Sequence, residues 1–133
     1  MGAGTAVRSF RDLRVWQLGM GLVEDTYGLT QRFPSVETYG LTSQMRRAAI
    51  SVPSNIAEGH GREHLKEYLH YISVAQGSLA ELQTQAEIAL RLEYISQAQM
   101  EGLIERAAAL AKQLHALRNS LLERAERRAG RVP

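Results

Sequence analysis

The strongest constraint on how this chain folds is the regular spacing of apolar residues in its last third. Over residues 97–127 a hydrophobic side chain recurs at alternating steps of three and four, at Met100, Leu103, Ala107, Leu110, Leu114, Leu117 and Leu121. Such steps place side chains on one face of an α-helix, and a sustained heptad is typical of helices that pack in bundles. Ser96 and Gln99 match a capping box, which marks the start of the helix. The pattern therefore predicts a long amphipathic helix over residues 97–127.

A first helix is predicted over residues 12–31, where apolar residues also recur at steps of three and four. Ser9 and Asp12 form a capping pair at its start, and Phe33-Pro34 ends it. The spacing assigns to its core face Leu13, Trp16, Met20, Val23 and Tyr27. It leaves partly outside that face Val15, Leu18 and Leu22.

A second helix is predicted over residues 41–58, with an inward face of Met45, Ala49, Val52 and Ile56. Pro53 lacks a backbone donor and crowds the carbonyl of Ala49, so a kink is expected there. Gly59-His60-Gly61 should end the helix, with glycine in the left-handed conformation. A third helix is predicted over residues 63–92, with an inward face of Leu65, Leu69, Ile72, Leu79, Leu82, Ala86 and Ala89.

Four long helices joined by short connections predict an all-α protein, an antiparallel up-down four-helix bundle with a Pro-kinked second helix. The bundle should span residues 9–127, between a disordered tail at 1–8 and a basic tail at 128–133. The apolar runs are a few residues long, whereas a membrane span needs about 20, and the first residues do not resemble a secretory signal. The chain has no cysteine, which fits a reducing compartment. We therefore expect a soluble cytoplasmic protein that does not contact a membrane.

The charge of the chain is small but uneven. The formal net charge is +2, and 14 of the 16 basic residues are arginine. Arginine favours forked contacts with phosphate or carboxylate, so a local basic patch is compatible with nucleic-acid binding. The candidate nucleic-acid contacts are Arg46, Arg47, Arg62, Arg124, Arg127 and Arg128.

The second helix also carries a polar stripe opposite its apolar face, formed by Arg47, Ser51, Ser54 and Glu58. Three interpretations stay open for it. It is a solvated face with weak ion pairing, a subunit contact in which Arg47 and Glu58 are hydrogen-bonded, or a phosphate-contacting surface led by Arg46 and Arg47. Glu58 opposes the third interpretation because phosphate contact needs a net positive patch.

Apolar residues that lie off the predicted core faces indicate a second buried surface. They occur on three helices and include Val15, Leu18, Leu22, Ile50, Tyr68 and Tyr71. A set spread over several helices is typical of an interface, so the sequence predicts a homo-oligomer. The candidate subunit contacts are Arg47, Ile50, Ser54 and Glu58.

No motif in the sequence predicts catalysis, a cofactor or a metal. His60 and His64 match the H-x-x-E-H spacing of a zinc peptidase class, but glycines flank His60 and no third ligand follows. Glu67 and His70 form one E-x-x-H unit, whereas a di-iron bundle needs two such units. Phosphate-binding glycine loops and nucleophile elbows are absent from the sequence. We expect a protein that is not an enzyme.

Three stretches carry a resemblance to a known family. The opening FRDL at 10–13, followed by VWQ at 15–17, resembles the start of the bacterial four-helix-bundle family, also called the 23S ribosomal RNA intervening-sequence protein family. The runs YGLTSQMRRAA at 39–49 and SVPSNIAEG at 51–59 are similar to its signature. The similarity extends over about residues 9–122 and is specific in the second helix.

The resemblance implies a ring of five subunits and a link to nucleic acid. Some members are encoded within insertions in ribosomal RNA genes, and relatives that serve diversity-generating retroelements bind nucleic acid and a reverse transcriptase. It implies no catalytic residues, and the signature positions Gln44, Arg47, Pro53, Asn55 and Glu58 serve fold or assembly as readily as ligand binding.

The sequence thus predicts a non-enzymatic oligomeric bundle that binds nucleic acid or a ribonucleoprotein partner through Arg-rich surfaces. A protein-protein interaction scaffold without a nucleic-acid role is the alternative. An enzyme whose site forms between subunits is a third hypothesis. Salt dependence separates the first two, because phosphate binding weakens steeply as salt is added.

Overall fold

The computed structural model describes residues 7–130, and this part of the chain is helical without strands. Short 3₁₀ helices lie at Phe10–Asp12 (η1) and Ser35–Glu37 (η2). The long helices are α1 (Arg14–Thr30), α2 (Leu41–His60), α3 (Leu65–Arg91) and α4 (Gln97–Arg128). Most of the two predicted tails lies outside the described residues. No helix between residues 7 and 130 is both long enough and apolar enough to cross a membrane.

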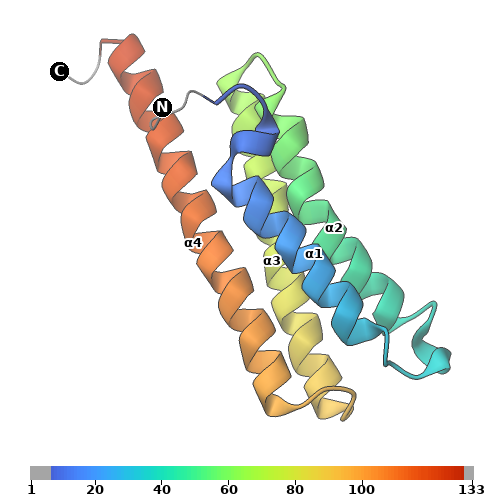
Figure 1. Ribbon diagram of the computed structural model, residues 1–133. Coiled ribbons are helices and arrows are strands. Elements are labelled where there is room, and N and C mark those ends of the chain that lie inside the picture. Colours follow the sequence, from blue (N-terminus) through green and yellow to red (C-terminus); the bar gives the residue numbers. More distant parts are fainter. Residues whose placement is uncertain (1–6, 131–133) are drawn as a thin grey trace.

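The four long helices form a closed bundle. Helix α2 packs against α1 and α3, and α4 packs against α3 and α1. Figure 1 shows each helix running back alongside the one before it, with the end of α4 extending past its neighbours. The prediction of an all-α four-helix bundle is confirmed.

The core faces of three helices follow the predicted spacing. On α2 the four predicted side chains Met45, Ala49, Val52 and Ile56 are fully buried. The inward residues of α3 are buried from Ile72 onward, whereas Leu65 and Leu69 at its start are half-buried. On α4 the heptad is buried from Met100 to Leu114, and Leu117 and Leu121 are half-buried where the helix approaches its end. The core is therefore densest at the middle of the bundle.

The predicted core face of α1 is wrong. The buried residues of this helix are Val15, Gly19, Leu22, Thr26 and Thr30, whereas Met20 and Tyr27 are 42% and 40% exposed. Leu13, Trp16 and Val23 pack against the core only in part. The face of α1 that carries its smaller residues is directed to the core, because this face lets α1 approach α2 closely.

Two details of α1 make this face possible. A Cβ atom at Gly19 would lie 3.3 Å from Cβ of Pro53, so glycine allows the close contact. The hydroxyls of Thr26 and Thr30 each donate at 2.8 Å to a carbonyl four residues earlier, of Leu22 and Thr26 respectively. Buried threonine is tolerated when its hydroxyl is hydrogen-bonded in this way.

Helix α2 passes through Pro53 without ending, and the kink itself stays a prediction. Its end differs from the prediction. The capping residue Gly61 has a φ of −80°, in the right-handed region and not the left-handed one. Its N–H donates to Ala57 O at 3.3 Å, and the N–H of Arg62 donates to Gly59 O at 3.1 Å. These right-handed turn bonds satisfy the last carbonyls without a left-handed glycine.

Glu37 joins three separate parts of the chain at one end of the bundle. Its Oε1 accepts from the N–H of Leu41 at 3.0 Å, at the start of α2, and its Oε2 accepts from the Tyr94 hydroxyl at 2.8 Å. Tyr94 belongs to the connection between α3 and α4. The N–H of Leu41 and the hydroxyl of Tyr94 hold the pKa of Glu37 below its ordinary value.

We predict that Glu37 contributes to the pH dependence of unfolding. Because its pKa is lowered in the folded state, the stability it adds is present above its unfolded pKa and is lost as pH falls through the folded pKa. Glu37→Gln should therefore reduce the loss of stability on acidification, measured by denaturant unfolding between neutral and acid pH. Asp12 also has a lowered pKa, so the relevant quantity is the difference between wild type and variant. Identical pH profiles for the two proteins would contradict the prediction.

We also predict that Leu110→Ala or Leu114→Ala costs about 2–5 kcal/mol of unfolding free energy, as expected for truncation of a core leucine. Both side chains are at most 1% exposed. Leu117→Ala is the comparison, because the same truncation at a half-buried position of the same face should cost less. Chemical denaturation of the three variants measures these differences. A loss below about half a kcal/mol for both core variants would contradict the assigned face.

Candidate interaction surfaces

The turn between α2 and α3 is closed by a network that uses two of the predicted site residues. Glu58, on the last turn of α2, forms an ion pair with Arg62. The Nη2 of Arg62 also donates to the Tyr71 hydroxyl at 3.0 Å, and its guanidinium lies 5.1 Å from the centre of the Tyr71 ring. His60 approaches Tyr68 across the same turn. Glu58 and Arg62 are thus already engaged within the chain.

Gly59 explains why this turn is so tight. A Cβ atom at Gly59 would lie 2.8 Å from Cβ of Tyr71 and 3.1 Å from Cδ1 of Tyr68. Such distances leave no room for a side chain, so α2 and α3 meet here through a glycine backbone. Burial at this contact raises the pKa of Tyr68. Gly59 therefore has a packing role in the part of the chain that resembles the family signature.

A polar groove runs between the middle parts of α2 and α3. The hydroxyl of Ser78 donates to Ser51 Oγ at 2.8 Å, and Nδ2 of Asn55 donates to the carbonyl and the hydroxyl oxygen of Ser51 at 2.7 and 2.9 Å. These bonds form the floor of the groove. The depression above it has a volume of about 290 Å³ and is lined by Gln44, Arg47, Ala48, Ser51, Ser78, Glu81 and Gln85.

Arg46 and Arg47 do not form one basic surface, although they are adjacent in sequence. The Nε of Arg46 donates to Thr30 Oγ1 at 2.9 Å, and its guanidinium lies 4.2 Å from the centre of the Tyr27 ring. Arg46 is therefore held against α1. Arg47 is exposed, lines the polar groove and has no hydrogen bond or ion pair within residues 7–130. Of the other candidate subunit contacts, Ser54 is exposed, as is Ile50 at 41%.

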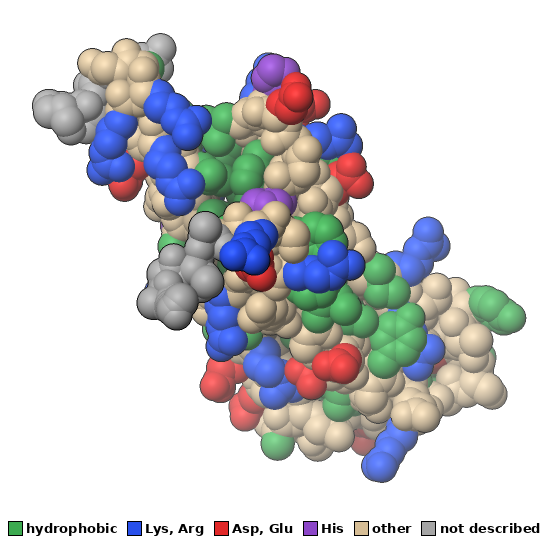
Figure 2. Space-filling view, turned by 45° about the horizontal axis from the view of Figure 1, so that its top comes forward, with side chains coloured by type: hydrophobic (Ala, Val, Ile, Leu, Met, Phe, Trp, Pro, Cys, Tyr) green, Lys and Arg blue, Asp and Glu red, His purple; other side chains and the backbone are tan. Residues whose placement is uncertain are grey.

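The end of α4 brings the three remaining arginine candidates together. Arg124, Arg127 and Arg128 occupy its last two turns and are exposed. Figure 2 shows Lys and Arg side chains gathered over this end of the helix. Within residues 7–130 the hydrogen-bond and ion-pair contacts of these arginines are long: Nη2 of Arg124 lies 3.4 Å from Ser120 Oγ, and Nη2 of Arg127 lies 3.8 Å from Glu123 Oε2. Their guanidinium groups remain accessible to a partner.

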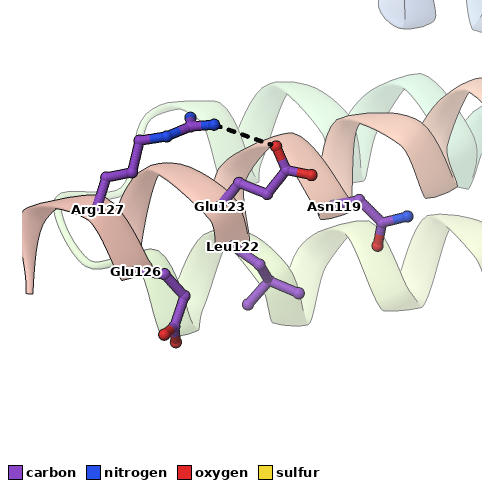
Figure 3. Close-up of a pocket in the computed structure, with 5 residues that line it drawn as sticks. All are labelled: Asn119, Leu122, Glu123, Glu126 and Arg127. Atoms are coloured by element: carbon purple, nitrogen blue, oxygen red, sulfur yellow. Dashed lines mark ion pairs between the residues drawn. The ribbon is translucent and has the colours of Figure 1, made fainter. Parts of the chain in front are cut away.

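Two shallow depressions flank these arginines. The first is lined by residues of α4 alone, as Figure 3 shows: Asn119, Leu122, Glu123, Glu126 and Arg127. In that view Arg127 and Glu123 point to one side of the helix, and Leu122 and Glu126 to the other. The second lies between the end of α4 and the start of α3, lined by Leu65, Leu121, Arg124, Ala125, Arg128 and Ala129. Apolar and charged side chains line both depressions, and this combination suits contact with a macromolecule.

The histidines are separated by the structure. Within residues 7–130, three His, Cys, Asp or Glu side chains nowhere gather in a group that could hold a metal ion. His60 is the last residue of α2, His64 precedes α3, and the ring of His70 lies edge-to-face against Tyr71. The two histidines of the zinc motif thus lie at the end of α2 and at the cap of α3, and the histidine of the di-iron motif lies on the surface of α3.

Sequence reasoning missed the α3 side of the polar groove. Ser78, Glu81 and Gln85 recur at steps of three and four, so they form a polar stripe on a helix whose other face is apolar. The same spacing defines the polar stripe on α2, so it is the sequence signal that predicts the α3 stripe. The pairing of the two stripes depends on how α2 and α3 pack.

The fold and these surfaces define the class of the protein, which is an all-α four-helix bundle with a tight turn after its second helix. The chain belongs to the family described as 23S rRNA-intervening sequence protein, which matches residues 11–116. A solved structure from the S23 ribosomal protein family of Bacteroides thetaiotaomicron, whose function is unknown, has a similar fold with a TM-score of 0.73. It shares 18% identity and covers 78% of this chain and 97% of its own. No curated protein matches the chain.

We predict that Gly59→Ala destabilises the protein by about 1–3 kcal/mol, as overpacking does in a rigid contact. The control is Gly21→Ala on α1, where an added Cβ would meet nothing within 4 Å. That substitution should stabilise by about 0.5–1 kcal/mol, because alanine favours a helix interior. Urea unfolding of both variants at one protein concentration gives the two values. Equal effects of the two substitutions would show that the turn has room for a side chain.

Proposed function

We propose that this protein is a non-enzymatic, cytoplasmic homo-oligomer that binds structured RNA through the arginines at the end of α4. The observation that carries the proposal is the group formed by Arg124, Arg127 and Arg128, whose guanidinium groups make only long hydrogen-bond or ion-pair contacts within the described residues 7–130. Membership in a family named for a ribosomal RNA intervening sequence supports RNA as the partner. Arginine is suited to this role because its fork of donors can hold a phosphate with two bonds.

The mode of binding follows from the shape of the surface. The end of α4 extends past the neighbouring helices (Figure 1) and carries its arginines on long side chains, so it can contact phosphates without reading base edges. Base-specific contacts to double-stranded RNA are restricted by the deep, narrow major groove. Recognition would therefore depend on the shape and the backbone of the RNA.

Assembly into an oligomer would strengthen RNA binding, because each subunit adds a further copy of one weakly charged site. The net charge of a single chain is +2, which gives weak attraction to a polyanion. Several copies on one body can bind a long RNA with much greater avidity than one copy. Exposed apolar residues on α1 and α2, Met20, Tyr27 and Ile50, support association of subunits. The number five comes from the family resemblance alone.

We predict that the combined change of Arg124, Arg127 and Arg128 to alanine weakens RNA binding and makes it less dependent on salt. Each lost phosphate contact should lower the slope of log K against log salt by about 0.7–0.9, so the slope should fall by about two to three. The measurement is fluorescence anisotropy with a labelled RNA hairpin between about 50 and 200 mM salt.

The matched control changes Arg14, Arg32 and Arg91 to alanine. These three arginines are exposed on other parts of the molecule. Replacing them lowers the net charge by the same amount as the change of Arg124, Arg127 and Arg128. Equal weakening by both triple variants would mean that binding depends on total charge and not on the end of α4. If the wild type does not bind at low salt, the protein is better described as a protein-binding scaffold, and a reverse transcriptase becomes a partner to test.

A further inference from the structure

We infer that two different faces of this chain bind each other in neighbouring copies. The α1–α2 face of one copy, formed by Met20, Tyr27 and Ile50, packs on the α3 ridge of the next copy, formed by Val74, Glu81 and Ile88. The same contact then repeats from copy to copy around a ring. The inference rests on the proposed homo-oligomer and names the two surfaces through which it assembles.

The exposed apolar residues of the long helices lie on three of the four helices. Met20, Tyr27, Ile50, Val74 and Ile88 are 37–42% exposed. Helix α4 is the longest, yet among the described residues it carries no large apolar side chain as exposed as these. A single exposed apolar residue is normal, but a set on one side of a molecule is typical of an interaction surface. Apolar surface is therefore left uncovered on both sides of α2 and not along α4.

The α1–α2 face is continuous across the two helices. The guanidinium of Arg46 lies 4.2 Å from the centre of the Tyr27 ring, and its Nε donates to Thr30 Oγ1. Ile50 follows one turn further along α2, and Met20 lies two turns back along the antiparallel α1, so both are on the same outer side as this contact. Figure 2 shows hydrophobic side chains gathered on the side of the bundle that α1 and α2 form. Tyrosine, methionine and arginine are residues that protein interfaces favour.

The α3 ridge offers an apolar surface of a different shape. Val74, Glu81 and Ile88 recur every seven residues, so they lie in one line along the outside of the helix. Gly77 lies beside this line, and a Cβ atom there would meet nothing within 4 Å. The surface is therefore low at Gly77, and a large side chain of another copy can pack against the helix there. Glu81 also lines the groove between α2 and α3, which places the ridge on the α2 side of α3.

Charge favours a second copy as the partner of both faces. Within residues 7–130 the Nη atoms of Arg46 and the carboxylate of Glu81 have no hydrogen bond or ion pair. An arginine at one apolar face and a carboxylate in the other can pair when the two unlike faces meet. A nucleic acid would instead bring phosphate against Glu81 and leave Val74 and Ile88 uncovered. One chain thus carries both halves of a complementary contact.

The placement of the two faces suits a ring. Among the described residues the helix contacts run from α1 to α2, α2 to α3, α3 to α4 and α4 to α1, so α2 and α4 lie at opposite corners of the bundle. The α1–α2 face and the α3 ridge lie on the two sides of α2. A contact between unlike faces turns in the same direction at each step and can close a ring, whereas a face that binds itself stops at a dimer. Helix α2 then points toward the ring axis and α4 lies outside, where its arginines can reach RNA.

Two matched double variants test the two faces separately. Met20→Gln with Ile50→Gln changes the α1–α2 face, and Val74→Gln with Ile88→Gln changes the α3 ridge. Glutamine is uncharged and favours helices, so each chain should fold and keep its net charge. Each variant should weaken self-association by roughly a hundredfold or more, as measured by sedimentation velocity over a range of concentrations. If the wild type is a monomer, or if either variant associates like the wild type, the inference is wrong.

The control changes two exposed apolar residues outside both faces, Val36→Gln with Leu92→Gln. These side chains are 83% and 48% exposed and lie in the connections at one end of the bundle. This variant should associate like the wild type. Weakening equal to that of the face and ridge variants would mean that association depends on total exposed apolar area, and it would overturn the inference.

A mixture of the face variant and the ridge variant distinguishes unlike faces from a face that binds itself. The ridge variant supplies an intact α1–α2 face, and the face variant supplies an intact α3 ridge, so one contact can form and no third chain can add. The equimolar mixture should therefore form a complex of twice the 14.8 kDa chain mass and no larger. If the ridge variant assembles alone through its α1–α2 face, or if the mixture stays monomeric, the inference is overturned.

The RNA assay on the same samples keeps this inference separate from the proposed function. The face and ridge variants retain the arginines of α4 and the net charge, so as monomers they should still bind a hairpin, at lower avidity. A wild type that assembles through these faces but does not bind RNA would remove RNA binding and leave the inference standing. A wild type that binds RNA as a monomer would remove the inference and leave RNA binding in place.

Discussion

The close approach of α2 to both its neighbours is the constraint on which the rest of the structure depends. Gly19 lets α1 lie against Pro53, and Gly59 lets α3 lie against the end of α2. These contacts bring backbone near side chain, so small residues decide how α1 and α3 are rotated. The rotation of α3 then places Ser78 opposite Ser51, and the polar groove follows from that register. The position of the polar groove thus depends on Gly59, a glycine that lies outside it.

The helical pattern predicted most of the fold because three of the helices bury their most apolar stripe. In α4, leucines at heptad spacing leave one possible inward face, and that face is buried from Met100 to Leu114. In α1, the most apolar stripe is not the one that packs, because Gly19 and Thr26 allow a closer contact than Met20 and Tyr27 would. The hydrophobicity of a residue indicates how much apolar surface it can bury, but it does not indicate how closely two helices can approach. The error in α1 has this physical origin.

The candidate site was harder to predict because its parts lie on different helices. The sequence placed Arg47 and Glu58 on one polar stripe and left three interpretations of that stripe open. In the structure Glu58 binds Arg62 across the turn, and Arg47 lines a groove together with Glu81 and Gln85 of α3. The arginines at the end of α4 were found because they are close in sequence. Spacing along one helix predicts which residues share a face, and the packing of two helices decides which faces meet.

The two surfaces differ in charge in a way that suits different tasks. The groove combines Arg47 with Glu81, so its charges balance and it offers little to a polyanion. The end of α4 carries three arginines, and Arg127 approaches Glu123 no closer than 3.8 Å, so this ion pair neutralises the arginine charge there only weakly. Residues beyond 116 lie outside the part of the chain that matches the family, and they include all three of these arginines. The polar groove and the basic end of α4 therefore consist of separate residues, so the arginines at the end of α4 can change without altering the groove or the bundle.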